Sequence, residues 1–196
     1  MYNHKKYFCI SSLITIVLML FYSFPASGAD TYRIDPSHTS ITFKIKHLGI
    51  SNVHGRFNDV SGTMIFDPNS PAGSSIDIQV KTESIDTSHS KRDDDLRSSN
   101  FFDAAKYPTI KFKSTSVKKV DSDNYEVTGN LTLHGVTRKL KLSVLKTGEG
   151  KDPWGGYRIG FETAYLIKRS DFGMKKMLGA AGDKVRMNVG VEAIRK

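Results

Sequence analysis

Apolar and polar side chains alternate one by one in eight separate runs of this chain, and this period of two constrains its fold more than any other feature. Successive side chains of a β-strand point to opposite faces, so the alternation predicts strands with one buried and one solvated face. In the sixth run it places Leu142 inward and Lys141 outward. Turn-forming residues separate the runs, as at His54–Gly55 and His134–Gly135. The predicted strands cover residues 41–46, 60–66, 76–81, 110–113, 125–133, 139–144, 158–165 and 185–192.

These runs predict a single all-β domain built as an antiparallel meander with one apolar face. The longest interruption extends from Ser88 to Pro108. In it we predict a short helix, from a solvated acidic start at Asp93–Asp95 toward Ala105 and ended before Pro108, that crosses one end of the domain. Two architectures can bury the apolar face: a sandwich of two sheets, or a closed barrel whose interior can hold a small ligand. The alternation alone does not choose between them.

The first 29 residues have the order of a secretory signal peptide. Lys5 and Lys6 precede an apolar run over residues 7–24, and the small residues of 25–29 follow. This arrangement predicts cleavage between Ala29 and Asp30, although an uncleaved membrane anchor is the alternative reading of the same run. We therefore divide the chain into a signal peptide, 1–29, and one exported domain, 30–196.

Composition narrows the function of the exported domain. The only cysteine, Cys9, lies in the predicted signal peptide, so thiol catalysis and disulfides are excluded from 30–196. The signal holds two of the 29 basic residues and none of the 20 acidic ones, which lowers the formal net charge from +9 to +7. The basic residues alternate with apolar ones along the strands, a pattern typical of a solvated sheet face. We therefore predict no nucleic-acid binding.

The motifs of catalysis and metal binding are missing from the sequence. The five histidines after residue 29 have no spacing typical of a metal site, and no nucleophile elbow or phosphate-binding loop is present. His38, His47 and His54 could meet at one end of a hairpin and hold a metal, but isolated turn and cap histidines are the favoured interpretation. We therefore predict no catalytic residues, no metal, no cofactor and no enzymatic activity.

Several local motifs follow one another in an order that resembles the YceI-like family, also called polyisoprenoid-binding or lipid-binding periplasmic proteins. The likeness covers essentially all of the chain after the signal. Two positions depart from the family pattern: Asp95 stands where a histidine is frequent, and Lys139 where proline is. The motifs are YRIDPSHTSITF at 32–43, HLGISNVHGRF at 47–57, SIDT at 84–87, RD and LRS within 92–98, FFD and YP within 101–108, VTGNLTLHGVT at 127–137 and RSDFGM at 169–174.

This resemblance implies an extended, lipocalin-like, eight-stranded antiparallel barrel with an apolar tunnel, and it favours the barrel over the sandwich. It also implies that the protein sequesters, stores or carries a long-chain polyisoprenoid, an isoprenoid quinone or a similar amphiphilic lipid in the periplasm. Arg92 and Asp93 are our candidates for contact with the head group. The apolar side chains that we expect to line the tunnel are Phe43, Ile45, Phe66, Ile78, Phe112, Leu131, Leu142, Phe161 and Met187.

Two other functions stay open at this point. One is an enzyme that acts on a lipid head group through a histidine–carboxylate pair, and the other is a stress-related structural or interaction module with a basic outer face. The sequence leaves open a transient contact with a membrane and a homodimer.

Overall fold

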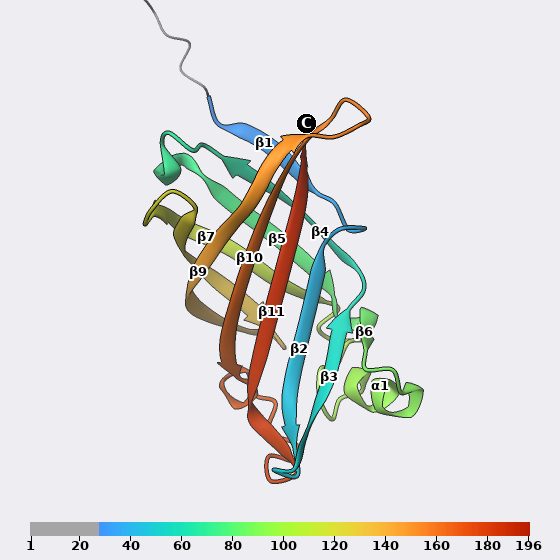
Figure 1. Cartoon of the computed structure of the whole chain (residues 1–196). Coiled ribbons are helices and arrows are strands. Elements are labelled where there is room, and N and C mark those ends of the chain that lie inside the picture. The colour runs from blue at the N-terminus through green and yellow to red at the C-terminus, as the bar shows by residue number, and fades with distance from the viewer. Residues whose placement is uncertain (1–27) are drawn as a thin grey trace, which may run out of the picture.

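The computed structural model describes residues 28–196, so the predicted signal peptide lies almost wholly outside the described residues. The described part is mostly sheet, with one short α-helix (Figure 1). The elements are β1 (Asp30–Ile34), β2 (Ser40–His47), β3 (Ser51–Phe57), β4 (Val60–Phe66), β5 (Ser75–Lys81), β6 (Ile85–Asp86), α1 (Ser90–Arg97), β7 (Thr109–Lys119), β8 (Asn124–Leu133), β9 (Val136–Lys151), β10 (Tyr157–Lys168) and β11 (Ala181–Arg195), with 3₁₀ turns at Pro71–Gly73, Thr82–Ser84 and Arg169–Phe172.

The strands form a closed antiparallel barrel. The ring of eight strands runs β1-β4-β5-β7-β8-β9-β10-β11 and closes because β1 pairs with both β4 and β11. β2, β3 and β6 continue the lines of β1, β4 and β5 toward the other end of the molecule, where β2 also pairs with β11. The predicted eight-stranded barrel is therefore confirmed, and the sandwich is not the fold.

Each of the eight predicted runs lies within a strand, but the alternation missed β1, β3 and β6. The predicted turn at His54–Gly55 is wrong, because Gly55 lies inside β3 opposite Phe43. A Cβ atom at Gly55 would overlap the Phe43 ring and the Thr87 methyl group, so a larger residue here would have to displace both. The hairpin turns instead at Leu48 and Gly49, which have φ angles of 51° and 72°.

The predicted helix is shorter than expected. α1 begins at Ser90 and ends at Arg97, where the N–H of Ser98 donates to the carbonyl oxygens of Asp94 and Asp95. Ser98 has an extended backbone conformation and ends the helix well before Ala105. After the helix, the half-buried Phe102 ring packs edge-on against Phe57 with 5.8 Å between centroids. Among the described residues, no helix is long and apolar enough to cross a membrane.

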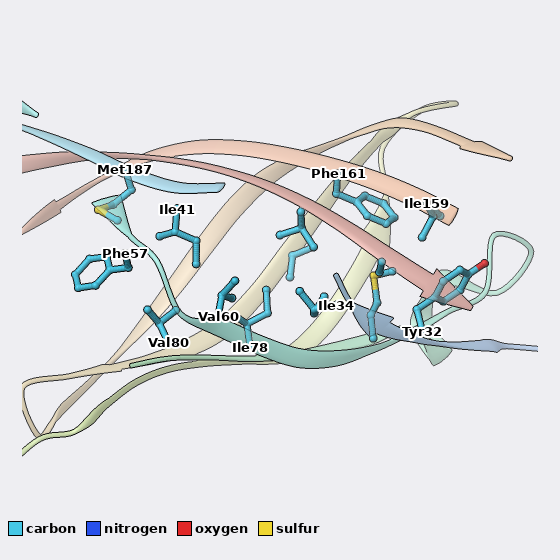
Figure 2. Close-up of a cluster of buried hydrophobic side chains, with 14 of the residues drawn as sticks. Tyr32, Ile34, Ile41, Phe57, Val60, Ile78, Val80, Ile159, Phe161 and Met187 are labelled. Carbon is cyan, nitrogen blue, oxygen red and sulfur yellow. The ribbon is translucent and has the colours of Figure 1, made fainter. Parts of the chain in front are cut away.

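Buried hydrophobic side chains extend along the inside of the barrel (Figure 2). We call the end that holds Tyr32, Ile34 and Ile159 the packed end. Tyr32, Ile34 and Ile159 are no more than 2% exposed. They come from β1 and β10, which lie on either side of β11 where the ring closes. These side chains therefore close the barrel interior at the place where β1 completes the ring.

Candidate functional site

The barrel encloses a cavity of about 730 Å³. Its walls are almost wholly apolar, and its polar and charged lining residues gather mainly where β2, α1 and the start of β11 meet. We call that region the open end. All nine apolar side chains predicted for the tunnel line this cavity: Phe43, Ile45, Phe66, Ile78, Phe112, Leu131, Leu142, Phe161 and Met187.

The register of the sheet explains why these side chains share one surface. Ile78 pairs with Phe112, and Phe112 pairs with Leu131, so three neighbouring strands present one row to the interior. On β9, Leu142 is 7% exposed and lines the cavity, whereas the ammonium of Lys141 lies outside, 2.7 Å from the Glu126 carboxylate. The predicted facing of this strand is confirmed.

Three aromatic rings meet in the part of the cavity wall near the packed end. Phe66 lies 5.5 Å from Tyr125 and 5.4 Å from Phe161, centroid to centroid, and both contacts are edge-to-face. This geometry favours contact between the positive edge of one ring and the negative face of another. All three rings also line the cavity, so they form its floor.

Tyr165 is a lining residue that we did not predict. It lies on β10 on the same face as Phe161, and its partner on β11 is Met187. Burial raises the pKa of its hydroxyl to about 12. The alternation of β10 places Tyr165 on the inward face, but a tyrosine in a strand is equally compatible with a half-exposed position.

Of the two predicted head-group residues, one borders the cavity and one does not. Arg92 on α1 lines the cavity, and its guanidinium donates from Nε to the Thr87 hydroxyl at 2.7 Å and from Nη2 to the Thr87 carbonyl oxygen at 2.8 Å. Asp93 is 5% exposed and lies outside the lining, so the expected solvated helix start is wrong at this residue. Its carboxylate accepts hydrogen bonds from the N–H and the hydroxyl of Thr87, and it therefore holds α1 in place.

A buried arginine fixes the chain on the other side of the open end. The Arg169 guanidinium donates to the carbonyl oxygens of Met174, Ala181 and Gly182 at 2.9–3.0 Å. Burial lowers the pKa of this group, while the carboxylate of Asp183 opposes that change. These three bonds tie both ends of the β10–β11 connection to one side chain.

The histidines lie apart, in turns, in strands and at the cap of α1, so the interpretation as turn and cap residues does not hold for His47 and His54. His89 is the N-cap of α1 and accepts from the N–H of Arg92, and the His134 ring bonds to the carbonyl oxygen of Phe172. His54 pairs with Lys44 within the β2–β3 hairpin, whereas His38 lies at the break between β1 and β2. The structure therefore does not gather His38, His47 and His54 into one cluster.

His38 instead lies beside Asp35 and Glu192, and their ligand atoms are within 4.8 Å of one another. The Nη1 atom of Arg158 lies 2.6 Å from both carboxylates, and its Nε lies 2.8 Å from Asp152. A guanidinium thus occupies the position between these carboxylates where a metal would need to bind. The arrangement is an ion-pair network that joins the β1–β2 break to β11 and the β9–β10 turn.

A closed antiparallel barrel around an apolar cavity with a polar mouth defines the class of small β-barrels that can enclose a ligand. Within that class, the model of the YceI-like domain matches residues 32–193, and the chain belongs to this family.

Relatives of similar length support this assignment. A UPF0312 protein of Pseudomonas aeruginosa is 45% identical over 179 residues, which cover 90% of this chain and 93% of the relative. Protein YceI of Escherichia coli O157:H7 is 43% identical over 185 residues, which cover 93% and 96%.

Solved structures share the fold. The YCEI protein of Campylobacter jejuni superposes with a TM-score of 0.70 at 37% identity, over 77% of this chain and 90% of that one. A polyisoprenoid binding domain from Saccharophagus degradans superposes with a TM-score of 0.67 at 19% identity, over 84% and 98%.

Proposed function

We propose that this protein binds one long-chain polyisoprenoid or a similar amphiphilic lipid inside the barrel, and stores or carries it through the periplasm. The observation that carries the proposal is the cavity of about 730 Å³ with apolar walls and a polar mouth. The Saccharophagus degradans domain, which has the same fold, is a polyisoprenoid binding domain, and this agrees with the proposed ligand class.

The apolar wall supplies affinity without specific polar contacts. Burial of hydrocarbon stabilises a complex by roughly 0.8 kcal/mol for each methylene, so about ten carbons contribute several kcal/mol. Such a wall distinguishes chains by length and shape, and it distinguishes head groups weakly. Selection among head groups therefore depends on the few polar groups that border the cavity.

Arg92 is the residue that we expect to meet the head group. Its two bonds to Thr87 use Nε and Nη2 and fix the plane of the guanidinium at the edge of the cavity. Nη1 is the nitrogen we expect to donate to a ligand oxygen, because a guanidinium presents its donors in a planar fork. The hydrocarbon chain then extends toward the aromatic floor.

Extraction of the purified protein with organic solvent, followed by mass spectrometry, tests the proposal. We expect about one long-chain lipid per barrel. Protein that contains no lipid, and that takes up none from an added polyprenyl lipid or quinone, would contradict the proposal. Recovery of a chemically altered lipid would support an enzyme instead.

Export to the periplasm rests on the first 29 residues of the sequence. We expect the protein recovered from the periplasmic fraction of a bacterial host to begin at Asp30. N-terminal sequencing decides this, and a chain that begins at Met1 and sediments with membranes would support the uncleaved anchor.

A further inference from the structure

Two exposed chain tips stand side by side at the open end (Figure 1). One is the β2–β3 turn, where Ile50 is 83% exposed, and the other is the β10–β11 connection, where Met177 is 53% exposed. The N–H of Leu48 donates to the carbonyl oxygen of Ala180 at 2.7 Å, so the two tips are joined. We call residues 46–52 and 173–180 the rim. Lys46, His47, Met174 and Met177 of the rim also line the cavity, so the rim borders its mouth.

Two apolar residues of the rim have backbone conformations that large side chains seldom adopt. Leu48 and Met177 both have left-handed backbone conformations, with φ angles of 51° and 56°. This region favours glycine, asparagine and aspartate and is unfavourable for large side chains. Arg169 fixes the second tip through its bonds to Met174 and Ala181. Exposed Leu48, Ile50, Met177 and Leu178 therefore form a fixed apolar surface, which soluble proteins seldom present without a partner.

The two rim segments carry charge of one sign. Residues 46–52 contain Lys46, residues 173–180 contain Lys175 and Lys176, and neither segment has an aspartate or glutamate. Asp94 and Asp95, acidic residues of the same end, lie on α1 and outside the rim. An anionic surface is therefore attracted to the rim itself.

We propose that the rim docks on an anionic phospholipid bilayer. Ile50 and Met177 enter the headgroup region together with Leu48 and Leu178, while the rim lysines lie against lipid phosphates. Apolar side chains among basic neighbours are the combination that binds peripheral proteins to membranes. The proposal rests on the proposed function, because it sets the mouth of the cavity on the surface where a lipid enters or leaves the barrel.

Sedimentation with vesicles tests the docking surface. The protein is residues 30–196, which contain every strand of the barrel. We expect binding to vesicles of phosphatidylglycerol and phosphatidylethanolamine, weaker binding at high salt and little binding to phosphatidylcholine alone. The pair Ile50→Glu and Leu178→Glu should lower the partition coefficient at least tenfold. Because each lysine near an anionic surface contributes about fivefold, Lys175→Glu with Lys176→Glu should lower it by a further similar factor.

The packed end offers matched controls. Trp154 is 80% exposed in the β9–β10 turn, and Lys118 and Lys119 are exposed at the end of β7. Trp154→Glu replaces an exposed apolar side chain, and the pair Lys118→Glu with Lys119→Glu reverses two charges, at the end opposite to the rim. Each should keep the partition coefficient within about twofold, because solvated charges more than a Debye length of about 8 Å from the surface are screened.

Lipid extracted from each variant separates this proposal from the proposed function. The rim variants should keep their bound lipid, because they leave the cavity wall intact. Wild-type protein that carries no lipid but still binds anionic vesicles through the rim would support docking and contradict the proposed function. The docking surface would be overturned if the rim variants and the packed-end variants lost vesicle binding equally. It would also be overturned if wild-type protein that carries lipid did not bind vesicles. The docking surface would also be overturned if the wild-type protein formed a dimer in solution, did not bind vesicles, and became monomeric in the rim variants.

Discussion

At the packed end Tyr32, Ile34 and Ile159 fill the barrel, whereas at the open end Ile45 and Met177 border the cavity. Backbone pairing differs in the same direction. At the packed end β1 joins β4 to β11, while at the open end the sheet order stops at β6, which pairs with β3 and is covered by α1. Where β1 closes the ring, the strands are paired all the way round. Where β6 is the edge strand, α1 covers that edge and the cavity opens beside it. One alternating pattern can therefore give a solid core or a container, depending on where the ring is closed.

The largest expected effect comes from placing a charge on the cavity wall. Leu142→Lys places an ammonium among apolar side chains, which costs about 4 kcal/mol unless the group loses its proton or the strand rearranges. We expect the variant to lose its bound lipid and to unfold at lower urea. Lys141→Gln, at the exposed neighbouring position, should change the free energy of unfolding by no more than about 0.5 kcal/mol. Equal lipid content and stability in both variants would contradict the facing of β9.

Removal of the same methyl groups at the two ends compares a packed core with a cavity wall. Ile159→Ala should lower the free energy of unfolding by about 3 kcal/mol, because its neighbours cannot collapse into the space. Ile45→Ala should cost about 1–2 kcal/mol, since the side chain already borders the cavity. Urea unfolding measures both. Similar losses at the two sites would mean that the open end is packed as tightly as the other.

The stability contributed by the ion-pair network around Arg158 should fall in acid. Hydrogen bonds from the Ser37 hydroxyl, and then from His38 and Arg158, hold the pKa of Asp35 well below its usual range. Because the unfolded chain has the higher pKa, this stabilisation is fully present above about pH 4 and is lost as the pH falls through the folded-state pKa.

We therefore expect wild-type protein to lose about 1–2 kcal/mol more than Asp35→Asn between pH 5 and pH 2, measured by urea unfolding. Asp94→Asn, at a carboxylate that is 76% exposed, should follow the wild-type profile. Parallel profiles for wild type and Asp35→Asn would remove Asp35 from the ion-pair network around Arg158.

The smallest effect concerns where the head group lies. Tyr165→Phe removes a hydroxyl halfway along the cavity and should leave lipid retention within about twofold, because the proposed head-group contact is Arg92 at the mouth. Arg92→Gln should speed lipid loss by roughly tenfold, in line with one charged hydrogen bond of about 1.5 kcal/mol. Transfer of bound lipid to excess vesicles measures both rates. The reverse order would place the head group deep in the barrel.

Eight of the eleven strands in the described residues, and their facing, could be predicted from local sequence. Alternation in β9 placed Leu142 inward, and all nine of the apolar residues predicted for the tunnel do line the cavity, because a strand's two faces follow from local backbone geometry. The resemblance to a family chose barrel over sandwich.

Features that depend on contacts between distant residues required the tertiary structure. The sequence predicts a turn at Gly55, whereas the structure packs the Phe43 ring against it. The sequence predicts a solvated Asp93, whereas its carboxylate is buried and accepts a hydrogen bond from Thr87. Phe102, which follows α1, packs on Phe57, 45 positions away in the sequence numbering. Ring closure by β1, and the rim formed by Leu48 and Ala180, likewise join segments whose pairing no local pattern encodes, because each depends on the positions of strands made elsewhere in the chain.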